Sequence, residues 1–189
     1  SLGVEGQVMR VFVHHALLAA QPDLVITDAE AAISALRMIK TEADIAAMQA
    51  AVDISERALQ RTLDGVTLGQ TEKQIEQSLI KFMFDEGADG LAFNPIVAAG
   101  DGSARPHAHA REDYKVKAGD ALLIDFGARK NGFDADITRT VFLDHVSDEG
   151  RAVYDTVLAA NMAGRAPTPA GITAPGSDPA GNNVVEASP

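Results

Sequence analysis

The sequence predicts an α+β fold in which helices come first and antiparallel strands follow. Apolar residues recur at helical spacing through residues 41–87, and after Gly87 the spacing changes to that of strands. Two runs rich in β-branched and aromatic residues then flank Asn131–Gly132, a dipeptide typical of hairpin turns. A run of helices followed by a run of strands is typical of α+β domains.

The composition excludes several kinds of partner and site. The chain has 189 residues, of which 46% are apolar and 23% charged, so it can form a sizeable core. Its formal net charge of −11 and the lack of a basic patch argue against nucleic acid and membranes as partners. Without cysteine, a metal needs carboxylate, imidazole or carbonyl ligands. The lack of a signal-peptide pattern and of a bilayer-spanning apolar run predicts a cytoplasmic location.

Residues 1–27 are predicted to be the remnant of a small α/β domain, because the chain starts without methionine and this stretch has little apolar surface. Residues 9–14 are predicted to form a strand, residues 14–20 a short helix and residues 24–26 a second strand. Adjacent residues on a strand point to opposite faces, so His14 and His15 are not expected to share a metal ion.

Three helices are predicted next. Asp28 can cap a helix over residues 29–38, and Thr41 with Asp44 resembles a capping box that opens a longer helix ending at Asp64–Gly65. Thr71 with Gln74 is a second capping box, and Gly87 closes the helix that it opens. The apolar stripes of the last two helices are expected to be buried; they comprise Ile45, Met48, Val52, Leu59 and Leu63, then Ile75, Leu79, Phe82 and Met83.

The strands come after Gly87. Residues 93–99 contain Pro95, which predicts an edge or irregular strand. A loop over residues 100–111 follows, and then the two arms of a hairpin, residues 121–128 and 133–143. Ser147 is expected to start a further helix. Prolines and glycines would break a helix repeatedly in residues 164–189, which predicts a poorly ordered tail.

Asp125 and Asp136 lie in opposite arms of this hairpin. If the loop has four residues, they lie directly opposite one another; if only Asn131–Gly132 form the loop, Asp136 lies opposite Gly127. Both registers place the two carboxylates on the same face of the sheet, since side chains alternate along a strand.

Two carboxylates on one face repel each other, and a divalent cation would compensate for this. Mn²⁺, Mg²⁺ and Co²⁺ suit such oxygen ligands, and Zn²⁺ tolerates them. The alternative is that Asp134 and Asp136 are solvated charges or pair with Arg139, and the spacing alone does not separate these interpretations.

The order of three motifs is similar to a known family. The runs FNPIVAAGDGSARPHAHA, GDALLIDFGA and GFDADITRTVFL resemble the first half of the pita-bread metallopeptidase family (peptidase family M24). The segment LRMIKTEADIAAMQAAVDISERAL resembles the opening helix of its Xaa-Pro aminopeptidase and Xaa-Pro dipeptidase (prolidase) branch. The resemblance covers residues 28–163. It implies the N-terminal half of a pita-bread fold, which is a curved antiparallel sheet with helices on its outer face. Residues 1–27 would then be the remnant of an N-terminal creatinase-like domain, and residues 164–189 diverge from the family.

The resemblance also implies a site. Members of the family hold two divalent ions with five ligands, and Asp125 and Asp136 match two of these. The other three, a histidine and two glutamates, have no matching motif after residue 163. His107 matches the histidine that contacts the substrate and is the candidate catalytic residue, with His109 as the alternative substrate contact. Mn²⁺ is the expected metal, and Co²⁺ or Zn²⁺ are alternatives.

The function implied is hydrolysis of X–Pro peptide bonds by two-metal activation of water, on peptides with proline at the second position. A homodimer is implied for the full-length protein. This chain, with two of five ligands, is expected to be an inactive fragment on its own. Two alternatives stay open: a non-catalytic binding module with the same fold, and an enzyme similar to methionine aminopeptidase. A metal-free, creatinase-like hydrolase is disfavoured, because Asp125 and Asp136 are both present.

Overall fold

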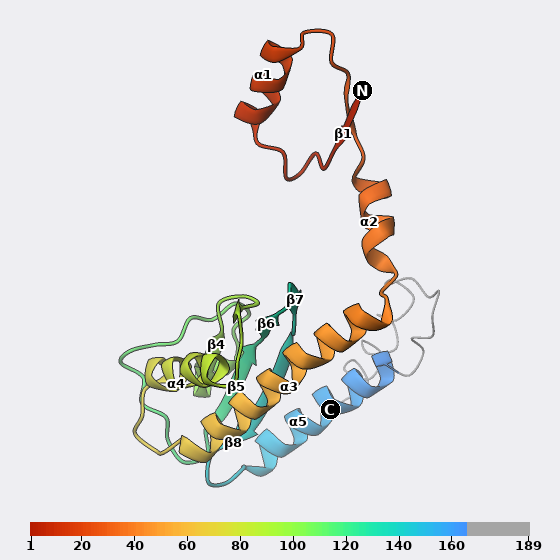
Figure 1. Ribbon diagram of the computed structural model, residues 1–189. Helices are drawn as coiled ribbons and strands as arrows, with labels where there is room; N and C mark the ends of the chain where they lie inside the picture. Colours follow the sequence, from red (N-terminus) through yellow and green to blue (C-terminus); the bar gives the residue numbers. More distant parts are fainter. Residues whose placement is uncertain (166–189) are drawn as a thin grey trace. The chain divides into compact units, whose positions relative to one another are not determined.

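The computed structural model describes residues 1–165, which belong to two compact units, Ser1–Gln49 and a second unit that begins at Ala50. In the first unit β1 (Leu2–Val4) pairs in parallel with β2 (Ile26–Asp28), and α1 (Val11–Ala20) connects them (Figure 1). The helix predicted over residues 29–38 is confirmed as α2 (Glu30–Met38), and Asp28 accepts a hydrogen bond of 2.9 Å from the N–H of Glu30.

The strand predicted over residues 9–14 is wrong, because α1 begins at Val11 and β1 lies earlier in the chain. Parallel strands need a crossover connection, and α1 supplies it between β1 and β2. His14 and His15 therefore lie on a helix, with ring centroids 5.8 Å apart. No cluster of three possible metal ligands includes them in the part of the chain that the structure describes.

Both predicted capping boxes are confirmed. The Thr41 hydroxyl accepts the N–H of Asp44 at 3.2 Å, and the Asp44 carboxylate accepts the N–H of Thr41 at 2.9 Å, where α3 (Glu42–Gly65) begins. Thr71 and Gln74 form the same reciprocal pair at the start of α4 (Glu72–Asp85). After α4, Gly87 adopts a φ of 100°, a left-handed conformation typical of a glycine that ends a helix.

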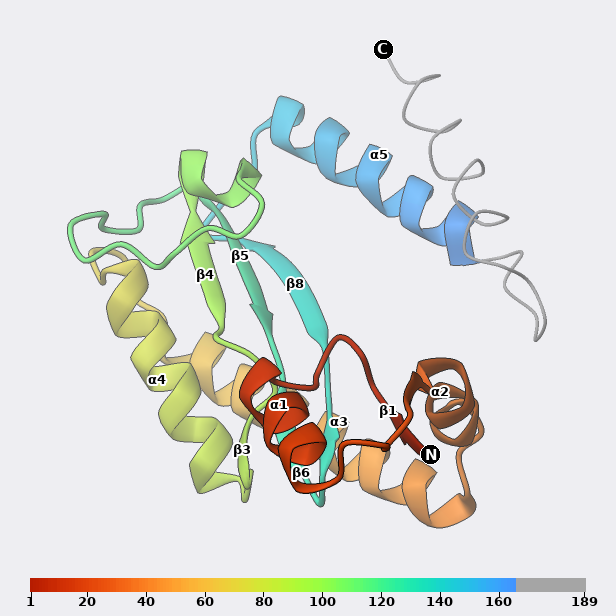
Figure 2. The same cartoon turned by 90° about the horizontal axis from the view of Figure 1, so that it is seen from above.

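The strands of the second unit form two antiparallel sheets. In one, β5 (Ala121–Phe126) lies between β4 (Ile96–Ala99) and β8 (Ile137–Phe142), as Figure 2 shows. The edge position predicted for the strand after Pro95 is thus confirmed. The other sheet has the order β3-β6-β7, and its strands are β3 (Gly90–Leu91), β6 (Ala128–Lys130) and β7 (Phe133–Asp134). Each predicted hairpin arm is therefore divided between the two sheets.

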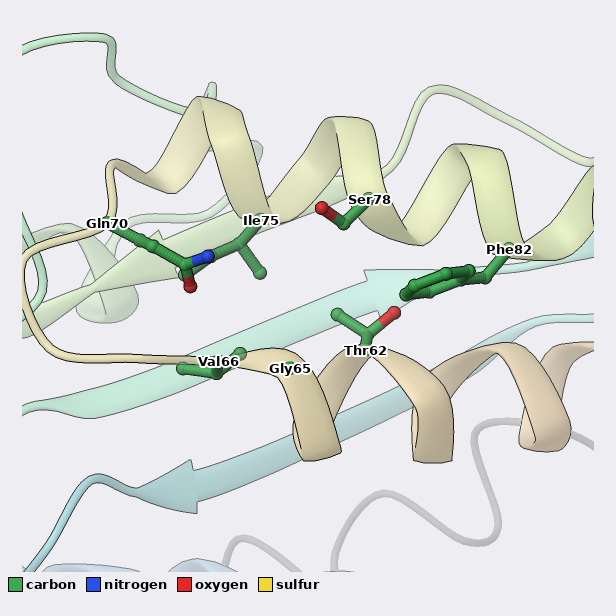
Figure 3. A pocket seen from close by; sticks show the side chains of 7 residues that line it. All are labelled: Thr62, Gly65, Val66, Gln70, Ile75, Ser78 and Phe82. Carbon is green, nitrogen blue, oxygen red and sulfur yellow. The ribbon is translucent and has the colours of Figure 1, made fainter.

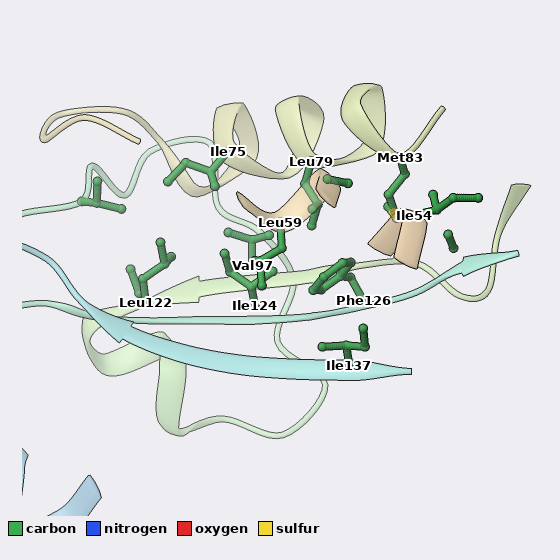
Figure 4. Packing of buried hydrophobic residues seen from close by; sticks show 14 residues of the cluster. Ile54, Leu59, Ile75, Leu79, Met83, Val97, Leu122, Ile124, Phe126 and Ile137 are labelled. Atoms are coloured by element: carbon green, nitrogen blue, oxygen red, sulfur yellow. The ribbon is translucent and has the colours of Figure 1, made fainter. Parts of the chain in front are cut away.

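The core lies between α3, α4 and one face of the sheet β4-β5-β8 (Figure 4). From α4 it takes Ile75, Leu79 and Met83, as predicted, whereas Phe82 is only half-buried. From the strands it takes alternate residues, Val97, Leu122, Ile124, Phe126 and Ile137. The opposite face of the sheet is partly exposed, with Asp125 and Thr138 on it, although Ala98 of β4 is buried there.

The predicted apolar stripe of α3 is confirmed in part, since Leu59 is buried and Val52 and Leu63 pack against the core. Ile45 and Met48 are 50% and 37% exposed, and the buried residues are Ala51, Ile54, Ser55, Ala58, Leu59 and Thr62. Small side chains let the helix approach the sheet closely. The Ser55 hydroxyl donates to the Ala51 carbonyl at 2.8 Å and accepts the N–H of Ala128 at 2.9 Å, so its burial leaves no polar atom unsatisfied.

Two further helical segments complete the described residues. The short 3₁₀ helix η1 (Gly100–Ala104) follows β4, and α5 (Asp148–Arg165) is the helix predicted to start at Ser147. No helix among residues 1–165 has the length and apolar character needed to cross a membrane. The tail predicted for residues 164–189 lies almost entirely outside the described residues.

Candidate metal centre

The hairpin adopts the shorter of the two predicted loops. Lys130 pairs with Phe133, so Asn131 and Gly132 alone form the turn. Their φ angles of 52° and 81° are both positive, as a type I′ turn requires. The pair Phe126 and Ile137 continues the same register in β5 and β8, which places Asp136 opposite Gly127.

The two aspartates share the open face of the sheet, which we define by Asp125, Asp136 and Thr138. Asp125 lies between buried Ile124 and Phe126 on β5 and is itself partly exposed. Thr138 lies directly opposite Asp125, and its hydroxyl donates a hydrogen bond of 2.9 Å to Oδ1 of the carboxylate. The alternation of burial confirms the expectation that both carboxylates lie on the face away from the core.

Gly127 allows the chain segment that carries Asp136 to approach β5. A Cβ atom at Gly127 would lie 1.7 Å from the carbonyl oxygen of Ala135, which no side chain can tolerate. The N–H of Ala135 donates to the Ala128 carbonyl at 2.9 Å, which holds the two segments together. The glycine of the run IDFGA is therefore a close-approach position between the two aspartates.

Of the alternatives that spacing left open, pairing with Arg139 is wrong, whereas a solvated charge stays open for Asp136, which is exposed. Asp134 pairs with Arg129 at 2.7 Å rather than with Arg139, whose Nη1 donates to the Thr138 carbonyl at 2.9 Å. The Asp136 carboxylate makes no hydrogen bond or ion pair with any other residue of the described range 1–165. Within that range, Oδ2 of Asp125 makes none either.

The chemistry of these donors fits part of a metal site. Both oxygens of Asp136 and Oδ2 of Asp125 accept no hydrogen bond from residues 1–165, and such carboxylate oxygens are ligands that hard divalent cations take. The set is incomplete, because no group of three His, Asp or Glu side chains within residues 1–165 is arranged to hold a metal ion. The structure thus brings Asp125 and Asp136 together on one face and adds no third ligand from the same range.

His107 and His109 lie in what we call the histidine loop, residues 100–110, between β4 and Arg111. Both imidazoles are exposed, and His107 has a φ of 54°, a left-handed conformation that is uncommon for a residue with a Cβ atom. The loop leaves β4 at Ala99, which pairs with Leu122, whereas Ile96 at the other end of β4 pairs with Asp125. The two histidines line a small pocket of about 250 Å³ together with Arg111.

Beneath the histidine loop lies an ion pair that the sequence did not indicate. Glu72 is fully buried, and its Oε1 accepts from Nη2 of Arg111 at 2.7 Å. This hydrogen bond raises the pKa of the Arg111 guanidinium above its usual range. Arg111 in turn lowers the pKa of the Asp101 carboxyl, which it binds at 3.0 Å. Glu72 and Arg111 are 39 positions apart, and neither local spacing nor a motif connects them.

Two hollows differ in what they can bind. One of about 880 Å³ lies on the same sheet face as Asp125, and Leu123, Thr140 and Tyr154 are among its lining residues. Another of about 180 Å³ lies between the end of α3 and α4 (Figure 3) and offers Thr62, Gln70 and Ser78 as its polar groups. No ionisable side chain lines the second hollow, whereas Asp101 and Glu149 line the first; Asp125 and Asp136 line neither.

Comparison with known proteins identifies the family. The family model described as metallopeptidase family M24 matches residues 46–187. The Xaa-Pro dipeptidase of Pyrococcus furiosus is 31% identical over 154 residues, which cover 82% of this chain and 44% of that protein.

Solved structures give the same result. The X-Pro aminopeptidase from Thermotoga maritima MSB8 is 34% identical with a TM-score of 0.91, over 97% of this chain and 51% of that one. The Xaa-Pro dipeptidase from Bacillus anthracis is 31% identical with a TM-score of 0.91, over 98% and 52%. The chain spans about half the length of these relatives, and over that half the predicted α+β, pita-bread fold is confirmed. This chain belongs to metallopeptidase family M24.

Proposed function

We propose that this chain supplies part of the catalytic centre of a metallopeptidase that hydrolyses X–Pro bonds in peptides with proline at the second position. The observation that carries the proposal is the pair of aspartates on one open sheet face, with no protein donor to Asp136 in residues 1–165. The names of the Pyrococcus furiosus and Bacillus anthracis relatives, both Xaa-Pro dipeptidases, support the substrate class.

In this proposal Asp125 and Asp136 hold two divalent ions, with Mn²⁺ as the expected metal and Co²⁺ or Zn²⁺ as alternatives. Such ions lower the pKa of a bound water and polarise the scissile carbonyl. Thr138 restricts the Asp125 carboxylate to one orientation through its hydrogen bond of 2.9 Å. The remaining ligands have to come from outside residues 1–165, so we expect this chain alone to bind Mn²⁺ weakly and not to turn over substrate.

His107 is the proposed catalytic residue of this chain. An exposed imidazole in a loop next to the sheet can donate a hydrogen bond to the substrate carbonyl oxygen as negative charge develops on it. His109 is the alternative, because it lines the same pocket. The apolar part of the hollow of about 880 Å³, which includes Leu123 on the same sheet face as Asp125, is suited to the proline side of a peptide. A cytoplasmic location and a homodimer of the full-length protein stay predictions.

A chimera tests the proposal directly. Residues 28–163 of this chain replace the matching segment of the Pyrococcus furiosus Xaa-Pro dipeptidase, and we expect the rest of that protein to supply the remaining ligands. We expect the chimera to cleave Ala-Pro in the presence of Mn²⁺, and Asp136→Asn to lower kcat/KM by at least about a hundredfold. Asp134→Asn is the matched control, because Asp134 lies two residues away and pairs with Arg129.

The same assay separates the alternatives. A folded chimera that binds Mn²⁺ and X–Pro peptide without cleaving it would favour a binding module. Preferential cleavage after an N-terminal methionine would favour an enzyme similar to methionine aminopeptidase. Robust hydrolysis of Ala-Pro by residues 1–189 alone would contradict the proposal that the site is incomplete.

A further inference from the structure

Glu72 is a buried carboxylate with no role in the proposed metal centre. It occupies the first turn of α4, directly after the N-cap Thr71, and its side chain is fully buried. Four hydrogen bonds reach it. Oε1 accepts the N–H of Ala99 and Nη2 of Arg111, each at 2.7 Å, and Oε2 accepts the N–H and Nε of Arg111 at 2.8 and 3.0 Å.

These donors are the two ends of the histidine loop. Ala99 is the last residue of β4, and Arg111 is the first residue after the loop. Nη2 of Arg111 also donates to the Ala99 carbonyl at 2.9 Å, so the two ends are tied to each other as well as to Glu72. One side chain of α4 therefore fixes the separation and the direction of both ends of the loop.

The loop is packed directly onto this ion pair. A Cβ atom at Gly102 would lie 2.8 Å from Nη2 of Arg111 and 3.4 Å from Oε1 of Glu72, so the backbone passes over the pair with no room for a side chain. Asp101 binds Nη1 of Arg111 at 3.0 Å from the same segment. The small pocket lined by His107 and His109 has Glu72, Gly102 and Arg111 in its wall.

Stability alone does not explain a buried charge at this position. Removing two charges from water is costly, and apolar residues of similar volume often give equal or greater stability than a buried ion pair. A carboxylate that accepts four N–H groups instead imposes directions on the chain, because each bond has a preferred geometry. His107 has its left-handed φ of 54° inside this loop, a conformation that persists only when the surroundings hold it.

We propose that Glu72, acting through Arg111, is a positioning residue that holds His107 and His109 in place beside the open face of the sheet. The role of the loop in catalysis rests on the proposed function. The restraint that Glu72 and Arg111 place on the loop does not depend on that function. Glu72 itself contacts neither substrate nor metal in this proposal.

Amide hydrogen exchange of the metal-free chain, residues 1–189, tests the restraint. The variant Glu72→Gln keeps the shape of the side chain, removes the charge and turns an NH₂ group toward groups that are themselves donors. Glu76→Gln is the matched control, because Glu76 lies one turn further along α4, is 8% exposed, and pairs with Lys73 rather than with the loop.

We expect Glu72→Gln to speed exchange at the Ala99 and Arg111 amides at least about tenfold, with Leu122 and Ile124 of β5 changing by less than about twofold. Glu76→Gln should leave all four amides within about twofold of the wild type. A residue that only adds global stability would instead accelerate the loop and β5 amides by the same factor. That result, or an equal effect of Glu76→Gln, would overturn the proposal.

Two further variants keep the test decisive. If Glu72→Gln does not fold, Gly102→Ala disturbs the same ion pair from the loop side without a change of charge, and the same loop-specific acceleration is expected. His107→Ala should leave the Ala99 and Arg111 amides protected, because it removes the positioned group and not the restraint. Since no metal or substrate is present, failure of the proposed peptidase activity would not alter these rates, and the two failures can be told apart.

Discussion

Thr138 lies directly opposite Asp125 on the neighbouring strand, and its hydroxyl donates a hydrogen bond of 2.9 Å to Oδ1 of that carboxylate. The bond leaves Oδ2 as the oxygen without a protein donor among residues 1–165. If Asp125 is a metal ligand, Thr138 is the residue that orients it. Partners of this kind are worth about 10- to 100-fold in metal affinity.

We therefore expect Thr138→Val, which preserves the branched shape, to weaken Mn²⁺ binding by about tenfold. Because Thr138 is exposed, the free energy of unfolding should change by less than about 1 kcal/mol. Isothermal titration calorimetry and thermal unfolding measure the two quantities. Thr140→Val, two residues along the same face, is the control, and equal weakening by both variants would argue against an orienting role for Thr138.

Asp136→Asn is expected to abolish detectable Mn²⁺ binding by the chain, since it removes one of the two carboxylates on the open face. Without metal, the same change should leave the melting temperature unchanged or raise it, because it removes repulsion between Asp136 and Asp125. Asp134→Asn should retain Mn²⁺ binding, because Asp134 is occupied by Arg129 at 2.7 Å. Equal loss of binding in both variants would point to nonspecific attraction by the acidic surface.

Gly127→Ala is expected to be among the most destabilising substitutions in the hairpin. The added Cβ would lie 1.7 Å from the Ala135 carbonyl oxygen, so the strands have to separate, at a cost of about 3 kcal/mol in the free energy of unfolding. Gly132→Ala is the control, because nothing lies within 4 Å of its Cβ position and only its φ of 81° opposes the change. Chemical denaturation should show a loss of about 1 kcal/mol for the control.

Much of the helix starts and of the hairpin could be predicted, because the sequence patterns that specify them are local. A capping box is complete within four residues, and Thr71 with Gln74 forms the bonds that the pattern implies. The face of a strand residue follows from parity, so Asp125 and Asp136 could be placed together before the loop length was known. The structure has the two-residue turn at Asn131–Gly132, and both possible registers place the two carboxylates on one face of the sheet.

The remainder depends on contacts that no local pattern encodes. The buried face of α3 includes the predicted Leu59, but it also includes Ser55 and other small residues, because close approach to the sheet favours small side chains; the predicted Ile45 is 50% exposed. Glu72 looks like a solvated acid at a helix start, and its partner Arg111 comes from a loop 39 positions later. For a metal ligand beyond Asp125 and Asp136 neither source of information helps, because no group of three His, Asp or Glu side chains within residues 1–165 is arranged to hold a metal ion.

His107 and His109 can be separated by substitution in the chimera with the Pyrococcus furiosus dipeptidase. We expect His107→Ala to lower kcat by about 100-fold, a typical value for the loss of one donor to a developing oxyanion, with Mn²⁺ binding unchanged. His109→Ala should have a smaller effect on kcat. A larger effect of His109→Ala on kcat would transfer the catalytic role to His109 and leave the metal assignment untouched.

The contact between α3 and α4 should make stability fall in acid. Arg57 and Arg61 of α3 each bind the Glu86 carboxylate at 2.8 Å, and these hydrogen bonds, led by that of Arg57, lower the pKa of Glu86 from its usual 4.5. A carboxyl group whose pKa is lower in the folded state stabilises the fold above its unfolded pKa, and this contribution is lost as the pH falls through the folded value. The melting temperature should therefore decrease below about pH 4.5, and Glu86→Gln should flatten this decrease. Glu56→Gln is the control and should leave the decrease unchanged, because Glu56 is an exposed carboxylate of α3 that forms no ion pair within residues 1–165.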